Sequence, residues 1–228
     1  MRIGDVVPLH LGTVTFPDWH PLAGGEGVVR AFLIRHPEGP ILFDTGVGFG
    51  HANIDEWYQP RSVRIEGALA AQGVAIEDLR FAINSHLHFD HSGQNPELGG
   101  VPIYVQSREL IAADAPAYTI PEWVHFPGAN YVGLEGDAVV APGVRILATP
   151  GHTPGHQSVA VETDEGQVLM AGQAIYSLTE FEHIARTGEL LPGDPPPDPD
   201  AYLDSARILV RLGADVVFFS HDEAVYRA

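Results

Sequence analysis

Ser85-His86-Leu87-His88-Phe89-Asp90-His91-Ser92-Gly93 gathers more potential metal ligands than any other stretch of this chain. His86 and His88 are two residues apart, so in an extended segment both project to one side and can bind the same ion. Asp90 and His91 follow a turn later and can address a second ion. Imidazole and carboxylate are the ligands that zinc and similar metals prefer where thiolate is absent. Because HxHxDH arises by chance in such a chain about two times in a thousand, it predicts a metal site rather than a solvated polar turn.

Three further histidines follow segments that have the length and composition of strands. His152 and His156 lie in the motif TPGHTPGH, directly after an apolar segment. A proline between these two histidines excludes a helical i, i+4 pair, so we expect one to bind metal and the other to be a structural hydrogen-bonding residue. His221 follows the last apolar segment of the chain. Histidines at the ends of several strands indicate one shared site at a sheet edge.

Apolar segments of strand length alternate with helical segments and Gly/Pro turns along the chain. We predict strands at 28–34, 41–43, 79–83, 101–105, 144–148, 158–161, 167–171 and 215–219, and helices at 65–72, after Ser107 as the cap, and at 201–212. The strands form two series, each interspersed with helices, which favours an α/β fold of two β-sheets packed face to face with helices outside. No linker long enough to separate independent units is present, so we expect a single domain over residues 1–228.

The composition excludes several classes of function. The formal net charge is −18, which argues against binding to nucleic acid or to an anionic membrane surface. The chain has no cysteine, so thiolate metal sites and cysteine nucleophiles are excluded, and its 12 histidines equal its lysines and arginines together. No apolar run is long enough to span a membrane, and the N-terminus lacks the apolar run of a secretory signal. These features predict a cytoplasmic protein with a small-molecule substrate.

Four motifs together carry a resemblance to a known family. Phe43-Asp44-Thr45-Gly46, HLHFDH, TPGHTPGH and the final Ser220-His221-Asp222 resemble the metallo-β-lactamase superfamily of hydrolases. Within that superfamily, HFDHSG, TPGHTPGHQS and the tyrosine in Ala174-Ile175-Tyr176 are most similar to the N-acyl homoserine lactonases, the quorum-quenching lactonase family. The resemblance extends from about residue 28 to 221. It implies a four-layer αββα sandwich of two mixed β-sheets with helices outside, and a two-metal site on its edge.

The resemblance also implies a role for individual residues. His86, His88 and His152 would hold the first metal ion, and Asp90, His91 and His221 the second. Tyr176 would contact the substrate carbonyl. Asp44 would lie next to the site and orient liganding histidines without binding metal itself. Two zinc ions are expected, with manganese, iron or cobalt as alternatives.

One residue departs from the family pattern. Where the family usually has an aspartate that bridges both metals, this chain has Gln173. An amide can offer one metal its carbonyl oxygen, but it is neutral and bridges poorly. Less negative charge then lies between two dications, and Asp90 and a bridging hydroxide must offset their repulsion. We therefore expect weaker or unequal metal occupancy. The alternative is a tolerated substitution, with water or hydroxide forming the bridge.

The site supports a specific reaction. A water bound to metal has its pKa lowered toward about 7, so hydroxide is available to attack a lactone or ester carbonyl. Tyr176 would donate a hydrogen bond to the oxyanion, and Asp90 would accept the proton of the nucleophile and return it to the leaving alkoxide. The predicted function is hydrolysis of a lactone ring, with an N-acyl homoserine lactone as the specific substrate. Two alternatives stay open: a thioester or other ester hydrolase, as in glyoxalase II-like members, and a catalytically impaired ligand-binding protein owing to Gln173.

The substrate pocket is predicted less sharply than the metal site. Aromatic side chains in expected loops are candidates to line a pocket for an acyl chain, with anchoring in the core as the alternative for each: Phe16, Trp19, Phe49, Trp57, Trp123 and Phe126. Residues 115–136 combine proline and aromatic residues with weak periodicity. We expect this segment to face the substrate.

Overall fold

The computed structural model describes residues 1–20, 22–193 and 195–228. Its first sheet is mixed and has the strand order β4-β1-β2-β3-β5-β6-β7. Strands β1, β2, β3 and β4 pair antiparallel, whereas β3, β5, β6 and β7 run parallel. The strands are β1 (Val6–Thr15), β2 (Glu26–Ile34), β3 (Ile41–Phe43), β4 (Arg61–Ser62), β5 (Phe81–Ile83), β6 (Ile103–Gln106) and β7 (Tyr131–Leu134).

The second sheet comes from the C-terminal part of the chain and is also mixed. Its order is β13-β12-β11-β10-β9-β8, with one parallel pair, β11 and β12, among antiparallel neighbours. The strands are β8 (Ala138–Ala141), β9 (Val144–Ala148), β10 (Gln157–Thr163), β11 (Gly166–Met170), β12 (Val216–Phe218) and β13 (Val225–Arg227). The parallel pair needs a crossover, and the helices between β11 and β12 supply it.

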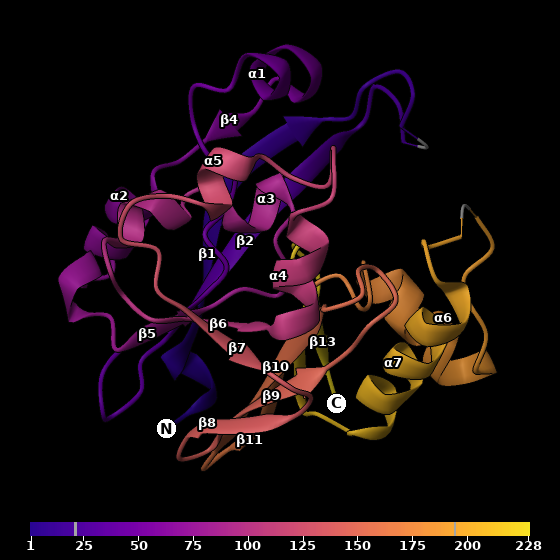
Figure 1. The fold of residues 1–228 in the computed structure, drawn as a ribbon. Helices are drawn as coiled ribbons and strands as arrows, with labels where there is room; N and C mark the ends of the chain where they lie inside the picture. The colour runs from indigo at the N-terminus through magenta and orange to yellow at the C-terminus, as the bar shows by residue number, and fades with distance from the viewer. Residues whose placement is uncertain (21, 194) are drawn as a thin grey trace.

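Helices cover the outer faces of both sheets (Figure 1). The α-helices are α1 (Ala52–Tyr58), α2 (Ile65–Ala70), α3 (Phe89–Ser92), α4 (Ser107–Ala113), α5 (Pro121–Val124), α6 (Leu178–Thr187) and α7 (Pro199–Arg211). Three short 3-10 turns are η1 (Ile3–Asp5), η2 (Ile76–Asp78) and η3 (Asn95–Leu98). Helices α6 and α7, orange to yellow in Figure 1, lie together on the side of the molecule away from α1 and α2.

Three apolar clusters define the layers. One lies between the first sheet and α1, α2 and α5, where Leu9 and Leu33 meet Ile54 and Leu69. The second lies between the sheets, where Phe32, Phe43 and Ile83 meet strands of the second sheet. The third packs the second sheet against α6 and α7. Because strands alternate their side chains between faces, each sheet contributes to two clusters. The predicted αββα sandwich is confirmed.

Most predicted elements are present with boundaries shifted by a few residues. The hairpin of β2 and β3, the helix α7 and the strands β9, β10, β11 and β12 lie where the pattern places them. Ser107 is the first residue of α4 and not its cap, because the capping position falls on Gln106. The prediction missed β1, in which Pro8 and a register shift between His10 and Gly12 interrupt the alternation of apolar residues.

Strand ends determine where the functional side chains lie. Strand β5 leads into His86 and His88, β9 into His152 and β12 into His221. The first two histidines therefore extend from one sheet and the last two from the other. Among the described helices, none is both long and apolar enough to cross a bilayer. A cytoplasmic location stays a prediction.

Candidate metal centre

The first group of potential ligands contains three histidines and no carboxylate. The Nε2 atom of His86 lies 3.0 Å from Nδ1 of His88, and Nε2 of His152 lies 3.2 Å from the same Nδ1 atom. One nitrogen from each residue falls within 4.8 Å of the other two. The lone pairs of ring nitrogens this close repel each other unless a proton or a cation lies between them. We call these three residues the imidazole triad.

The second group, Asp90, His91 and His221, also holds its ligand atoms within 4.8 Å of one another. The Nε2 atoms of His91 and His221 are 3.0 Å apart. Oδ2 of Asp90 lies 3.7 Å from the first of these atoms and 3.6 Å from the second. Asp90 and His91 belong to α3, one turn after His88, as the motif spacing predicts. We call these residues the carboxylate triad.

Burial keeps the imidazole triad neutral. Removal from water holds the pKa of His86 and that of His152 well below the usual value, and lowers the pKa of His88 to about 4. Neutral imidazoles have a free lone pair at neutral pH, which is the form that binds a metal ion. In the carboxylate triad, burial would raise the pKa of Asp90, but His91 and His221 hold it below its usual value. Asp90 is therefore ionised.

Hydrogen bonds outside the carboxylate triad orient its two histidines. Nδ1 of His91 donates to Oδ2 of the buried Asp44 at 2.8 Å, and Nδ1 of His221 donates to the carbonyl of Val28 at 2.7 Å. Both donations leave Nε2 free to face the site. Asp44 also accepts from the Ser85 amide at 2.7 Å, and its left-handed φ of 65° places the carboxylate there. Asp44 thus lies beside the site, in contact with a candidate ligand.

A buried carboxylate that sequence analysis did not identify supports the imidazole triad. Glu109 in α4 accepts from the amide of Leu87, between His86 and His88, at 2.8 Å. It also accepts from Thr153 Oγ1 at 2.8 Å and from the Gly155 amide at 3.1 Å, in the loop that carries His152. Tyr118 donates to it as well, and its ring packs against His88. Nothing in the sequence near Glu109 indicates this role, because its partners come from three separate segments.

His152 and His156 have different positions, as their spacing suggests. His152 belongs to the imidazole triad. Nε2 of the buried His156 accepts from the Gln173 amide at 2.9 Å, so its Nδ1 carries the proton and donates to Thr149 Oγ1 at 2.9 Å. A side chain at Gly172, where φ is +62°, would lie 2.7 Å from His156 Nε2. His156 therefore fixes the backbone that presents Gln173.

Gln173 and Tyr176 complete the site. The Gln173 side chain is buried and faces His91 and Tyr176. Its contact acts to raise the pKa of His91 and to lower the pKa of Tyr176. Its Oε1 atom is buried without a hydrogen-bond partner among the described residues. An orphaned acceptor is costly in a protein interior, and beside clustered imidazoles it fits a cation. The Tyr176 ring stacks on His221 at 5.0 Å. The donor set of nitrogen and oxygen atoms therefore fits metal ions.

A groove of about 570 Å³ opens from this site. Its lining includes His152 and Tyr176, side chains from the tip of the β1–β2 hairpin, and residues of α6, α7 and the loop between them. The described lining residues are His20, Leu22, His152, Tyr176, Ser177, Glu180, Leu191, Pro192, Gly193, Pro195, Pro196 and Tyr202. Its walls converge from loops far apart in sequence, so the sequence alone did not indicate them.

None of the aromatic residues proposed from the sequence lines this groove. Phe16, Trp123 and Phe126 pack into the cluster between the first sheet and its helices, which is the core alternative given for each of them. Trp19 and Trp57 are exposed and meet edge to face at 5.5 Å, and Phe49 lies under Arg64. Residues 115–136, which include α5 and β7, were expected to face the substrate but are not among the described residues that line this groove. Tyr118 of this segment packs against His88. Large apolar side chains in a loop are buried readily, so the core alternative holds for Phe16, Trp123 and Phe126.

Comparison with known protein families supports this geometry. The model of the metallo-beta-lactamase superfamily matches residues 24–221, a range that contains every residue of both triads. The chain belongs to the metallo-beta-lactamase superfamily. The resemblance of the four motifs is thereby confirmed.

Curated members of the superfamily narrow the comparison. An N-acyl homoserine lactonase from Bacillus sp. is 37% identical over 210 residues, which are 85% of this chain and 81% of the relative. The N-acyl homoserine lactonase AiiA of Bacillus thuringiensis subsp. kurstaki is 36% identical over the same share of both chains. The lactonase AttM of Azorhizobium caulinodans is 30% identical over 71% of this chain and 70% of its own. The predicted similarity to this group of enzymes is confirmed.

Solved structures agree with the curated relatives. A Bacillus thuringiensis AiiA variant with N-decanoyl-L-homoserine bound at its active site superposes with a TM-score of 0.82 and 31% identity. An N-acyl homoserine lactone hydrolase with N-hexanoyl-L-homoserine bound at its catalytic metal centre gives the same TM-score and 32% identity. Each comparison covers 98% of this chain and 95% of the other.

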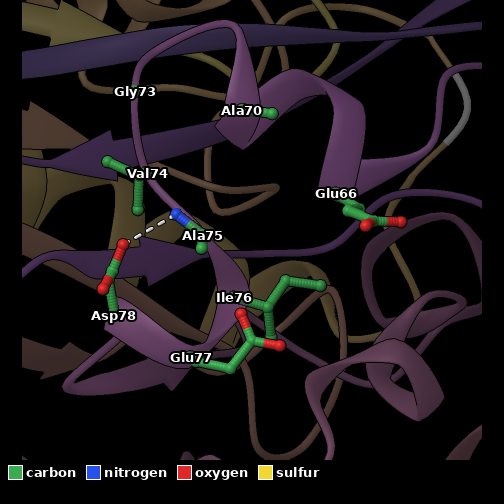
Figure 2. A pocket seen from close by; sticks show the side chains of 8 residues that line it. All are labelled: Glu66, Ala70, Gly73, Val74, Ala75, Ile76, Glu77 and Asp78. Carbon is green, nitrogen blue, oxygen red and sulfur yellow. Dashed lines mark hydrogen bonds between the residues drawn. The ribbon is translucent and has the colours of Figure 1, made fainter.

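A second hollow lies away from the two triads. It measures about 350 Å³ and lies at α2 and the turn that follows, where Glu66, Glu77 and Asp78 contribute carboxylates. Figure 2 shows these three side chains pointing in different directions. The Ala75 amide donates a hydrogen bond to Asp78 Oδ2 at 2.9 Å. The groups of potential metal ligands found among the described residues do not include them. The groups of potential metal ligands among the described residues are therefore the two triads.

Proposed function

We propose that this chain is a metal-dependent hydrolase that opens the lactone ring of N-acyl homoserine lactones. The observation that carries the proposal is the juxtaposition of two ligand triads and Tyr176, which stacks on His221 and lines the groove. The curated relatives at 36–37% identity bear the name of this activity, and a structural neighbour holds an open-ring product at its metal centre. Both support the assignment.

The proposed metal ions are two zinc ions. His86, His88 and His152 would hold one, and Asp90, His91 and His221 the other, with Oε1 of Gln173 as a further oxygen ligand. When bound, such ions lower the pKa of a water molecule and polarise an ester carbonyl. Because the Gln173 amide is neutral, one fewer negative charge offsets the repulsion between two dications. We therefore propose that the two sites bind metal with unequal affinity.

Two side chains have proton-transfer and hydrogen-bonding roles in this proposal. Burial raises the pKa of Tyr176 well above its usual value, so its hydroxyl stays protonated and can donate to the oxygen of the carbonyl under attack. Asp90 is ionised, so it can accept the proton of the attacking water and deliver it to the leaving alkoxide. The two roles require no change in the charge of Tyr176.

We also propose that residues 1–228 form a single domain. Both triads combine residues that follow strands of the first sheet with a histidine that follows a strand of the second. The apolar cluster between the sheets draws side chains from both halves of the chain. One cooperative unfolding transition, seen by calorimetry and by circular dichroism at the same temperature, is the expected result. Two separated transitions would contradict it.

The function is tested by metal content together with turnover of a panel of lactones, thioesters and simple esters. We expect up to two metal ions per chain and selective turnover of N-acyl homoserine lactones. Thioester-selective turnover would replace the lactonase assignment by another hydrolysis of the same superfamily. Turnover that appears only after Gln173→Asp is introduced would identify the natural protein as a ligand-binding member.

Tyr176→Phe tests the role of the hydroxyl group. We expect kcat to fall about 10²- to 10³-fold, the usual effect of removing one donor to a developing oxyanion, with metal content unchanged. Tyr104→Phe is the matched control, because Tyr104 packs against Phe81 next to the cluster between the sheets. An unchanged kcat in Tyr176→Phe would remove this hydroxyl from the mechanism.

A further inference from the structure

Glu180 places a carboxylate in the groove close to Tyr176. It lies in the first turn of α6, where its amide donates to Oγ of the capping residue Ser177 at 3.2 Å. Its Oε2 atom accepts from the Tyr176 amide at 2.6 Å, and both of its oxygens lie 3.1 Å from the Tyr202 hydroxyl. Helices α6 and α7 thus hold this carboxylate in one position beside the site.

None of the ion pairs among the described residues includes this carboxylate. Among the described residues that line the groove, Glu180 is the only acidic residue, and lysine and arginine are absent. Burial raises the pKa of Glu180, and the hydrogen bonds from the Tyr176 amide and the Tyr202 hydroxyl, together with the charge of His183, oppose this shift. A carboxylate offers about four lone-pair sites. The Tyr176 amide and the Tyr202 hydroxyl use only part of this capacity, so the Glu180 carboxylate can accept a further hydrogen bond.

The other residues of the groove indicate what kind of ligand would donate a hydrogen bond to Glu180. Leu22, Leu191 and three prolines contribute apolar surface, whereas His152 and Tyr176 belong to the reacting end. A ligand that fills this space combines a reacting carbonyl, an N–H donor and an apolar chain. Desolvating an ionised carboxylate against an apolar ligand without a donor is costly, so such ligands bind less well.

We propose that Glu180 is a specificity-determining residue that accepts a hydrogen bond from an N–H group next to the reacting carbonyl of the substrate. The inference rests on the proposed function and assigns Glu180 to the recognition of the N-acylated amine on the carbon beside the ring carbonyl of the lactone. The amide N–H of such a lactone lies within a few bonds of the carbonyl that faces Tyr176. Lactones of the same size without an N–H leave the carboxylate without this partner.

The test compares two lactones of equal ring size and chain length, one N-acylated and the other with an alkyl chain and no N–H. For Glu180→Ala we expect kcat/KM on the N-acylated lactone to fall about 10- to 100-fold, the range of a hydrogen bond to a charged group. Turnover of the alkyl lactone should fall less, because only the support of the Tyr176 amide is lost there. Glu180→Gln keeps the shape and a neutral acceptor, so its loss should be smaller.

Matched controls separate this role from a structural one. Glu182→Gln makes the same change of charge at an exposed position of α6, and should leave both lactones unaffected. Metal content and unfolding temperature are measured for each variant. Equal losses on both lactones would show that Glu180 acts only by supporting Tyr176, which would overturn the specificity role and leave the lactonase proposal intact. Wild-type protein without turnover of either lactone would overturn both proposals.

Discussion

The imidazole triad and the carboxylate triad lie side by side but differ in charge and in support. The first has three neutral ligands, and Glu109 holds the two loops that carry them without touching a ring. The second has an ionised ligand, Asp90, and a second carboxylate, Asp44, bonded directly to His91. Dications are stabilised more strongly by carboxylates than by neutral imidazoles. We therefore expect the imidazole triad to hold its ion less tightly.

Asp90→Asn should have the largest effect on this comparison. It removes the only carboxylate among the six described triad residues while it keeps the size of the side chain. We expect kcat to fall about 10²- to 10⁴-fold, because a proton acceptor is lost together with a ligand. Elemental analysis after dialysis should show reduced metal content. Asp204→Asn, on the exposed side of α7, is the control, and equal behaviour of the two variants would contradict the assignment.

Gln173→Asp and Gln173→Glu should strengthen metal binding. Each adds a negative charge at the buried amide position between His91 and Tyr176, and the glutamate variant preserves length. We expect the weaker ion to resist a chelator at about tenfold higher concentration, since one added charge near a dication strengthens its binding. Competition titrations with a coloured chelator measure this. Wild-type protein that already retains two equivalents through prolonged dialysis against a chelator would rule out unequal occupancy.

Asp44→Asn and Glu109→Gln should each weaken metal binding at one triad and not at the other. Loss of the Asp44 carboxylate should weaken metal binding about 10- to 100-fold at the carboxylate triad, because His91 loses its orienting partner. Glu109→Gln should act on the other triad, since an amide cannot accept from all the donors that surround Glu109. The absorption bands of Co²⁺-substituted protein distinguish the two sites. Identical spectra for both variants would refute the separate support of each triad.

Buried histidines give the metal-free protein a predictable dependence on pH. Burial lowers the pKa of His88 to about 4 and that of His156 to about 3, whereas both titrate near 6.5 in the unfolded chain. Below pH 6.5 the unfolded chain therefore binds more protons, and native stability falls as the pH decreases toward the folded-state values. Each such histidine contributes up to about 1.4 kcal/mol per pH unit.

The acid sensitivity is measured as the unfolding temperature of chelator-treated protein between pH 7 and 4.5. His156→Gln should give a shallower fall than wild type, because one buried neutral histidine is removed. His125→Gln, at an exposed histidine paired with Asp114, is the control. An unchanged slope in His156→Gln would contradict the attribution.

The sequence predicts the positions of the triads better than their surroundings. His86, His88, Asp90 and His91 share one motif, and the other histidines follow regular strands, so local spacing and strand ends indicated that they converge. The fold class followed from alternating apolar segments that correspond to β2, β3, β5, β6, β9, β10, β11 and β12, whereas β1, β4, β7, β8 and β13 were not predicted. These features are local, and local patterns are visible in one sequence.

The features that the prediction missed depend on contacts between distant segments. Glu109 accepts hydrogen bonds from the loop between β5 and α3 and from the loop after β9. Each partner is more than 20 residues away in the sequence. The groove combines Leu22 with residues beyond Tyr176. Trp123 and Phe126 resemble exposed loop aromatics in sequence, yet they complete the cluster under the first sheet. Burial of this kind is decided by tertiary packing and not by the neighbouring residues.

Each triad joins side chains that follow strands of different sheets, with His152 and His221 on one side and the HLHFDH residues on the other. An ion bound in either triad is then a cross-link between the two halves of the sandwich. Its binding energy adds to folding stability, by about 2.7 kcal/mol when free metal exceeds the dissociation constant a hundredfold. The lifetime of this protein against proteases in the cell would thus follow the supply of metal, and a chain deprived of metal would be degraded as well as inactive.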